Sequence, residues 1–257
     1  MDIDLDQGAL DLEQVDPNIQ GVIVTNIFGN VVDIQRYVEW TRNGRGQRFL
    51  IFDNAATALT FYRGKNCLNY GDGCTISFHH TKPFGFGEGG AIIADKKYEH
   101  AIRCLNNFGI GLRPDAYWSR EGNNNKMSDV SAAFIYSYLR GHLSTIVTRH
   151  QDLYRSFKIA IQKRPLRNFR LFPSFHDDND DKIVVSCFAI ICRRASDTLV
   201  REINRHGINC RRYYHPLAPL PNAQWLHDHI ICLPCHSDMK EEDVDHLVDV
   251  LHMLDDE

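Results

Sequence analysis

The sequence predicts an α/β fold with a largely parallel sheet and a second, smaller α/β unit. Up to about residue 110, short apolar runs alternate with stretches of helical spacing; a long helical pattern and a second alternation of strand and helix follow. Strands separated by helices favour a parallel sheet, because the helix returns the chain to the end at which the next strand starts. A chain of 257 residues can form one large domain or two small ones.

Four short runs in the first half are predicted as strands, because each is mainly apolar and rich in β-branched or aromatic residues. They span residues 21–28, 48–52, 74–78 and 90–94. Residues 31–42, between the first two, carry apolar side chains at helical spacing. The order strand, helix, strand indicates the start of a parallel sheet.

A long loop and a long helix are predicted next. Residues 107–125 are rich in Gly, Asn and Pro, and Ser128 is a candidate N-cap for the helical pattern that follows. We place a domain boundary near Arg149, which gives domains of residues 1–148 and 149–257.

The second domain is predicted to contain two strands and two helices. An acidic turn at 177–181 precedes them, and a loop with three prolines separates the last two elements. The predicted elements are a strand at 183–192, a helix at 196–206, a strand at 209–213 and a helix at 240–254.

Net charge and the apolar runs argue against several classes of protein. Lys and Arg total 29 and Asp and Glu total 33, so the net charge of −4 favours neither nucleic acid nor an acidic membrane as partner. The longest nearly apolar run, residues 183–192, is too short to span a bilayer. The N-terminus has neither the basic nor the apolar region of a signal peptide. We therefore expect a cytoplasmic protein.

The cysteines do not predict a metal site. Eight are scattered along the chain, and only Cys232 and Cys235 form a CxxC pair. A zinc site of this kind needs a second pair or a downstream HxxxH, and neither is present. We expect reduced thiols and no metal.

The densest chemical signal is SFHHTKPFGFGEGG, residues 77–90. Lys82 stands between Thr81 and Pro83, and a lysine held in so tight a segment loses hydration, which lowers the pKa of its amine. A neutral amine is the nucleophile that Schiff-base chemistry needs. The alternative is an exposed loop lysine. The glycines make a poor dinucleotide fingerprint, because a strand follows them where a helix should.

The second signal is Asp53, which closes the apolar run FLIF. Ligands of open parallel sheets bind beyond the carboxyl ends of the strands, so a carboxylate here can reach a bound cofactor. The alternative is an N-cap for the segment that follows.

Several segments, in this order, resemble the DegT/DnrJ/EryC1/StrS family, the sugar aminotransferases that use pyridoxal 5'-phosphate (PLP). The resemblance implies the aspartate-aminotransferase fold, fold type I. The matching stretches are FLIFDNAATAL, SFHHTKPFGFGEGGAI, GNNNKMSDVSAA, CRRYYHPLAPLP and CLPCHSDMKEEDVDHLVDVL.

The resemblance implies roles for four cofactor-binding residues. Asp53 would pair with the pyridine nitrogen of PLP, and Lys82 would form the Schiff base and move the proton during transfer. Ser77 would donate to the phosphate. Asn124 would reach the phosphate of a neighbouring subunit, because active sites of the family form across a homodimer interface.

The implied reaction moves an amino group, typically from glutamate, to a keto-sugar nucleotide in amino-sugar and polysaccharide biosynthesis. Tyr214 and His215 lie in the loop that faces substrate in the family. Plain packing beside Pro216 is the alternative for Tyr214. Retention of Lys82 argues against the dehydratase branch, in which this lysine is replaced.

The chain departs from the family pattern in ways that suggest a second reading. Ala56 stands where the family has Gln or His beside the cofactor ring, and Asn125 and Lys126 replace an aromatic residue and an arginine. The first part of the large domain, with its phosphate-binding Gly-Ser/Thr turn, has no counterpart before Gly21. The chain would then be a partial fold type I large domain plus a small C-terminal domain. The alternative function is a truncated or degenerate member that keeps the fold and dimer surface without catalysis.

Overall fold

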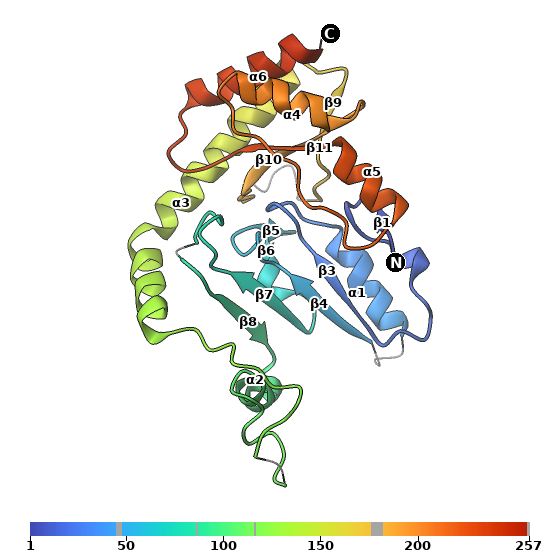
Figure 1. Ribbon diagram of the computed structural model, residues 1–257, viewed down its shortest axis with the longest axis vertical. Helices are drawn as coiled ribbons and strands as arrows, with labels where there is room; N and C mark the ends of the chain where they lie inside the picture. The colour runs from blue at the N-terminus through green and yellow to red at the C-terminus, as the bar shows by residue number, and fades with distance from the viewer. Residues whose placement is uncertain (45–47, 86, 116, 176–181, 256–257) are drawn as a thin grey trace.

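A computed structural model describes residues 1–44, 48–85, 87–115, 117–175 and 182–255. The two main sheets of the described residues, one above the other in Figure 1, are linked along one side by a long helix. The larger sheet has the order β3-β4-β7-β8 and the smaller one the order β11-β10-β9.

The larger sheet is mixed and mostly parallel, as the sequence predicts. Strands β3, β4 and β7 run parallel, and β8 pairs with β7 in the antiparallel sense. Their bounds are Gly21–Thr25, Phe49–Asp53, Gly73–Ser77 and Gly90–Ala94. The carboxyl ends of the three parallel strands therefore meet at one edge.

One face of this sheet is packed and the other is open. Along β3, Val22 and Val24 are buried, whereas Ile23 between them is 69% exposed. Helix α1 (Ile34–Asn43) covers the buried face, where the rings of Tyr37 and Phe52 meet edge to face at 6.4 Å. The period-two burial fixes which side chains reach each face.

Helix α3 (Asp129–Lys163) links the two sheets. Ser128 caps it, because its hydroxyl accepts a hydrogen bond from Ser131 N at 3.1 Å. The buried residues of α3 lie mainly in its second half, where Leu153 and Phe157 enter the C-terminal core. The expected boundary at residue 149 falls inside this continuous helix, and we retain it as a proposal.

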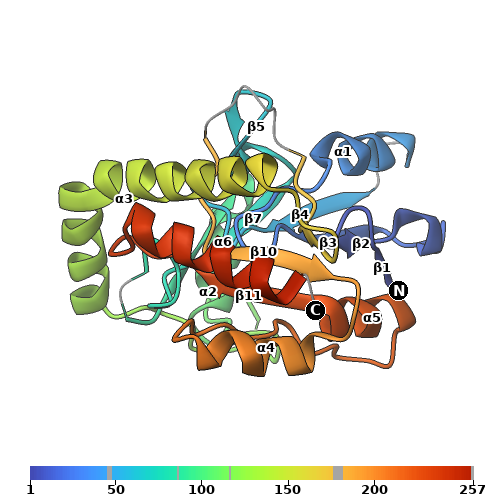
Figure 2. The same cartoon turned by 90° about the horizontal axis from the view of Figure 1, so that it is seen from above.

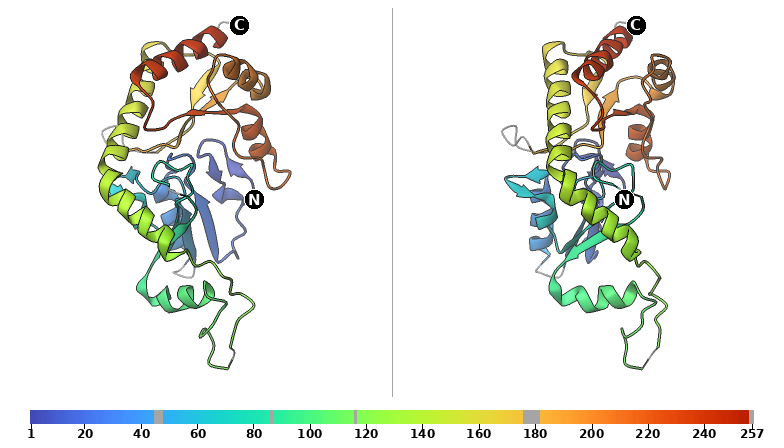
Figure 3. Two further views of the ribbon diagram at one scale, coloured as in Figure 1. Left: turned by 60° about the vertical axis from the view of Figure 1, so that its left-hand side comes forward. Right: turned by 90° about the vertical axis from the view of Figure 1, so that its left-hand side faces the viewer.

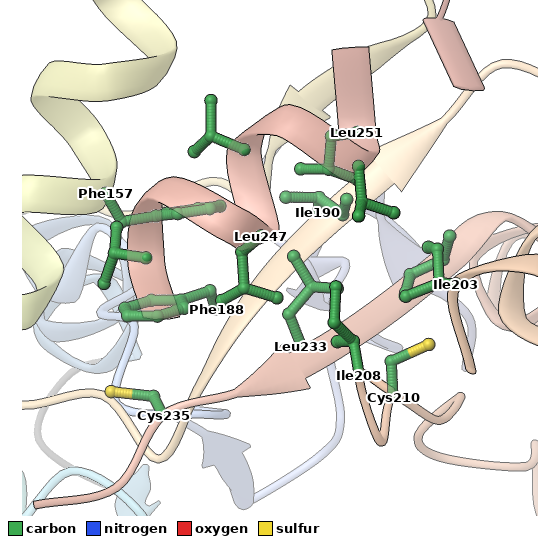
Figure 4. Close-up of a cluster of buried hydrophobic side chains, with 14 of the residues drawn as sticks. Phe157, Phe188, Ile190, Ile203, Ile208, Cys210, Leu233, Cys235, Leu247 and Leu251 are labelled. Carbon is green, nitrogen blue, oxygen red and sulfur yellow. The ribbon is translucent and has the colours of Figure 1, made fainter. Parts of the chain in front are cut away.

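The C-terminal unit is a three-stranded antiparallel sheet covered by helices. Figure 2 shows α6 lying between α3 and α4. Phe157, Phe188, Ile190, Leu233 and Leu247 meet in the core between sheet and helices (Figure 4). The elements are β9 (Phe169–Leu171), β10 (Cys187–Cys192), α4 (Ser196–Arg205), α5 (Pro221–His229), β11 (Ile230–Pro234) and α6 (Glu241–Asp255).

Short elements complete the chain. Helix α2 and the described residues of the loop between α2 and α3 extend away from the body (Figure 3). The short elements are β1 (Ile3–Asp4), β2 (Ala9–Leu10), β5 (Phe61–Tyr62), β6 (Lys65–Asn66), α2 (Glu99–Leu105) and the 3-10 turns Leu12–Gln14, Cys67–Asn69 and Lys96–Tyr98.

Two predictions about the C-terminal unit were wrong. Residues 209–213 form only an isolated bridge, between Arg211 and Cys232, and not a strand. The segment predicted as a loop from the prolines to residue 239 contains α5 and β11. Proline is compatible with the first turn of a helix, and Pro221 opens α5.

The predicted strand at 183–192 is shorter than expected. Val184 N donates to Thr60 Oγ1 at 3.1 Å, and Ser186 N donates to Phe28 O at 2.7 Å. These backbone groups bind the larger unit, so β10 begins at Cys187. The predicted acidic turn at 177–181 lies outside the described residues. Among the helices that the structure describes, none combines the length and the apolar character needed to cross a bilayer.

Candidate active site

The carboxylate of Asp53 is held at the carboxyl end of β4. Its Oδ1 accepts hydrogen bonds from Thr75 Oγ1 at 3.0 Å and from Ala55 N at 3.1 Å. Thr75 is the register partner of Asp53 on the neighbouring parallel strand β7. Oδ2 has no hydrogen bond with the described residues, so it is the acceptor left for a ligand.

A buried amide network supports this end of β4. Asn26 N donates to Asp53 O at 3.0 Å, and Asn26 Nδ2 donates to Asn54 Oδ1 at 2.7 Å. Thr57 Oγ1 donates to Asn26 O at 2.7 Å. Asn26, Asn54 and Thr57 are at most 1% exposed, so satisfied hydrogen bonds fix the backbone behind Asp53.

Lys82 lies in a tight turn on the connection from β7 to β8. Lys82 N donates to His79 O, and Gly85 N donates to Lys82 O, both at 2.9 Å. A Cβ on Gly85 would lie 1.8 Å from His79 O, so the turn requires glycine there. Phe84, 3% exposed, anchors the turn edge to face against Phe78.

Asp53 and Lys82 line one cavity of about 620 Å³. Desolvation lowers the pKa of Lys82. Electrostatic interactions with Asp53 and, after it, Cys187 act in the opposite direction. The lowered pKa agrees with the effect expected from the sequence, and it raises the share of Lys82 that is a neutral, nucleophilic amine near neutral pH.

Tyr214 closes another wall of the same cavity. Its ring stacks on Phe28 with centroids 6.0 Å apart and planes inclined by 8°, and desolvation raises the pKa of its hydroxyl. His215 is exposed and is not among the described lining residues. Its ring lies 4.9 Å from that of His227, which does line the cavity.

Ser77 and Asn124 do not join Asp53 and Lys82 in this cavity within one chain. Ser77, at the end of β7, accepts a hydrogen bond from His79 N at 3.2 Å. Asn124 is exposed on the loop after α2, where it bridges to Asn107. The roles expected for these two residues remain proposals.

Sequence reasoning missed several residues of the cavity. Phe28 and His227 come from segments distant in the chain. Thr75 lies outside the lining but holds Asp53, and only the strand register places it there. Ala56 lines the cavity and is 7% exposed, so the position expected to carry a polar side chain presents only a methyl group.

The donors of the cavity fit the ring and the aldehyde group of PLP. It combines an amine of lowered pKa, a carboxylate with one free oxygen and an aromatic wall, at the carboxyl edge of a parallel sheet. An amine suited to Schiff-base chemistry and a carboxylate in one cavity, at this edge of a parallel sheet, are what a PLP-dependent enzyme requires.

The chain belongs to the DegT/DnrJ/EryC1/StrS aminotransferase family, whose model matches residues 1–252. The cofactor of this family is PLP. The chain is 26% identical to a dTDP-4-amino-4,6-dideoxy-D-glucose transaminase of Shigella dysenteriae, with 94% of this chain and 68% of that protein covered. It is 27% identical to protein Rv3402c of Mycobacterium tuberculosis, with 92% of this chain and 60% of that protein covered.

Solved structures give the same fold. A DegT DnrJ EryC1 StrS aminotransferase from Brucella abortus superposes with a TM-score of 0.81 at 20% identity, covering 100% of this chain and 73% of that one. The chain thus spans 60% to 73% of the length of these three proteins.

Proposed function

We propose that the chain transfers an amino group, from glutamate, to a keto-sugar nucleotide in amino-sugar and polysaccharide biosynthesis. The observation that carries the proposal is the shared cavity of Lys82 and Asp53. The similarity to the Shigella dTDP-4-amino-4,6-dideoxy-D-glucose transaminase supports a sugar-nucleotide substrate.

Lys82 and Asp53 would have different roles in the transfer. Lys82 would hold the cofactor covalently and then take and return a proton at the α-carbon of the amino donor, for which its pKa must be low. Asp53 would accept a hydrogen bond from the pyridinium nitrogen. PLP, when bound, supplies the electron sink.

Other residues would position the ligands. Ser77 would donate to the cofactor phosphate, and Tyr214 and His215 would face the substrate. The stacking of Tyr214 on Phe28 supports this placement, because it holds the tyrosine ring at the cavity wall.

We propose a homodimer in which Asn124 reaches the phosphate of the partner's site. The loop that carries Asn124 extends from the body and exposes Phe108, Tyr117 and Trp118, of which Tyr117 is 82% exposed. Aromatic side chains of this kind are enriched at protein interfaces. The eight free cysteines support a reducing, cytoplasmic location.

A second candidate function rests on Ala56. A family member without a polar side chain there loses one contact to the cofactor, and a degenerate protein that keeps the fold without catalysis would tolerate that loss.

Purified protein mixed with PLP and glutamate separates the two candidates: an enzyme releases 2-oxoglutarate and then aminates an added keto-sugar nucleotide. Absence of 2-oxoglutarate with PLP bound supports the degenerate member.

A further inference from the structure

Three metal-ligating side chains gather on the connection between β7 and β8, beside the proposed cofactor site. His79, His80 and Glu88 each offer one ligand atom, and these atoms lie within 4.8 Å of one another. His79 Nε2 lies 3.3 Å from Glu88 Oε1, and the two imidazole rings have centroids 4.1 Å apart. No other cluster of this kind occurs in the described part of the chain.

The backbone places two of these side chains opposite each other. The β7–β8 register pairs Ser77 with Gly90, and the ladder continues because Phe78 N donates to Gly89 O and His80 N donates to Gly87 O, at 2.9 and 3.0 Å. Positions 79 and 88 therefore face each other between these hydrogen bonds. Side chains at such non-hydrogen-bonded positions approach most closely, so the ladder itself holds His79 against Glu88.

A further contact orients the first imidazole. His79 Nδ1 lies 2.8 Å from Thr81 Oγ1 and 3.3 Å from Thr81 N. Fixing one ring nitrogen in this way leaves the other, Nε2, directed at Glu88. Metal binding through Nε2 requires the tautomer in which Nδ1 carries the proton and donates to Thr81 Oγ1, as metal-binding histidines commonly do to an outer partner.

We propose that His79, His80 and Glu88 form a binding site for a divalent transition-metal ion, with Zn²⁺ as the best match. Two imidazole nitrogens and one carboxylate oxygen favour Zn²⁺ over Mg²⁺ or Ca²⁺, which prefer oxygen ligands. Three protein ligands leave a fourth position for water. His80 and Glu88 are exposed, so an ion can enter from solvent without opening the fold.

The bound ion would join the two arms of the hairpin that carries Lys82. His79 and His80 lie on the first arm, Glu88 lies on the second, and Lys82 follows His80 by two residues in the chain. An ion across the arms restrains the segment between them. The sequence pattern does not predict this site, because Glu88 is eight residues from His80. Only the hairpin register brings the carboxylate to the histidines.

Zinc binding to the chelator-treated full chain tests the proposal. Competition with a chromogenic chelator should give one tighter site in the unmodified chain, and His80→Ala and Glu88→Gln should each weaken it. Loss of an outer partner of a metal ligand already weakens binding by about 10–100-fold, so loss of a ligand should cost at least about tenfold.

His142→Ala is the matched control, since it removes an exposed imidazole on α3 that lies outside the cluster. It should leave the tight site intact, and circular dichroism should show an unchanged fold in all variants. Excess MgCl₂ should not displace the zinc. The proposal is overturned if His80→Ala and Glu88→Gln bind zinc as tightly as the unmodified chain. The contact between His79 and Glu88 would then be an ion pair only.

Discussion

Thr75 Oγ1 donates a 3.0 Å hydrogen bond to Oδ1 of Asp53, its register partner across the parallel strands β4 and β7. The bond occupies one carboxylate oxygen and leaves the other for a ligand. It also makes the orientation of Asp53 depend on a neighbouring strand, so the two residues should act together.

Removal of this hydrogen bond should slow transfer without removing the carboxylate. A hydrogen bond to a charged group contributes about 1.5–3 kcal/mol, so Thr75→Val should lower kcat about 10- to 100-fold. Asp53→Asn should lower kcat further while PLP still binds. Steady-state kinetics of the single and double variants check this, because the Thr75→Val effect should shrink in the Asp53→Asn background. Additive effects would contradict the coupling.

Replacement of Lys82 should abolish covalent cofactor binding. Lys82→Ala, mixed with PLP, should lack the yellow, borohydride-bleachable chromophore and should release no 2-oxoglutarate from glutamate. Lys240→Ala, which alters an exposed lysine before α6, is the control and should retain both properties. Mass spectrometry after borohydride reduction locates the adduct, and an adduct on another lysine would refute the assignment.

The lowered pKa of Lys82 predicts a pH-dependent stability. Below its folded-state pKa, Lys82 is charged in both states, and desolvation makes that charge unfavourable only in the folded protein. Stability should therefore rise as pH increases from that folded-state pKa toward 10.5, the ordinary value. Lys82→Met should raise the Tm of PLP-free protein at neutral pH, and the gain should shrink toward pH 10.5. An equal gain at every pH would point to packing instead.

A polar side chain at position 56 should tighten cofactor binding. Ala56 lines the cavity, so Ala56→Gln places an amide there. One added hydrogen bond contributes about 0.5–1.5 kcal/mol, which corresponds to about a 2- to 10-fold gain in PLP affinity. Fluorescence titration with PLP measures the change. Ala56→Leu, of similar size but without a donor, should give no gain.

Mixing of two impaired variants tests the shared site. Lys82→Ala and Asn124→Ala should each be impaired, but a heterodimer would contain one site with both native residues. Random reassortment under two-fold symmetry then restores about one quarter of the sites. Activity measured after co-refolding checks this, and sedimentation shows whether dimers form. No recovery in a mixture that contains dimers would place Asn124 outside the partner's site.

The strands and helices with clear periodicity could be predicted from the sequence. The β-branched runs of β3 and β4 and the alternation of burial along β3 follow from side-chain shape and the two-residue period of a strand. Lys82 and Asp53 could be singled out as candidates because each stands at the end of, or between, apolar runs, where a charged residue is unusual. The cap at Ser128 is a local hydrogen bond that residue type alone predicts.

Tertiary structure decided what lies beside these residues. The sheet order places Thr75 next to Asp53, the docking of residues 183–186 on the larger unit shortens β10, and the hairpin register brings Glu88 to His79. Tyr214 meets Phe28 from a segment almost two hundred residues away in the chain. Such contacts depend on which strands pair and how two units pack, and these non-local energies leave no periodic signal in the local sequence.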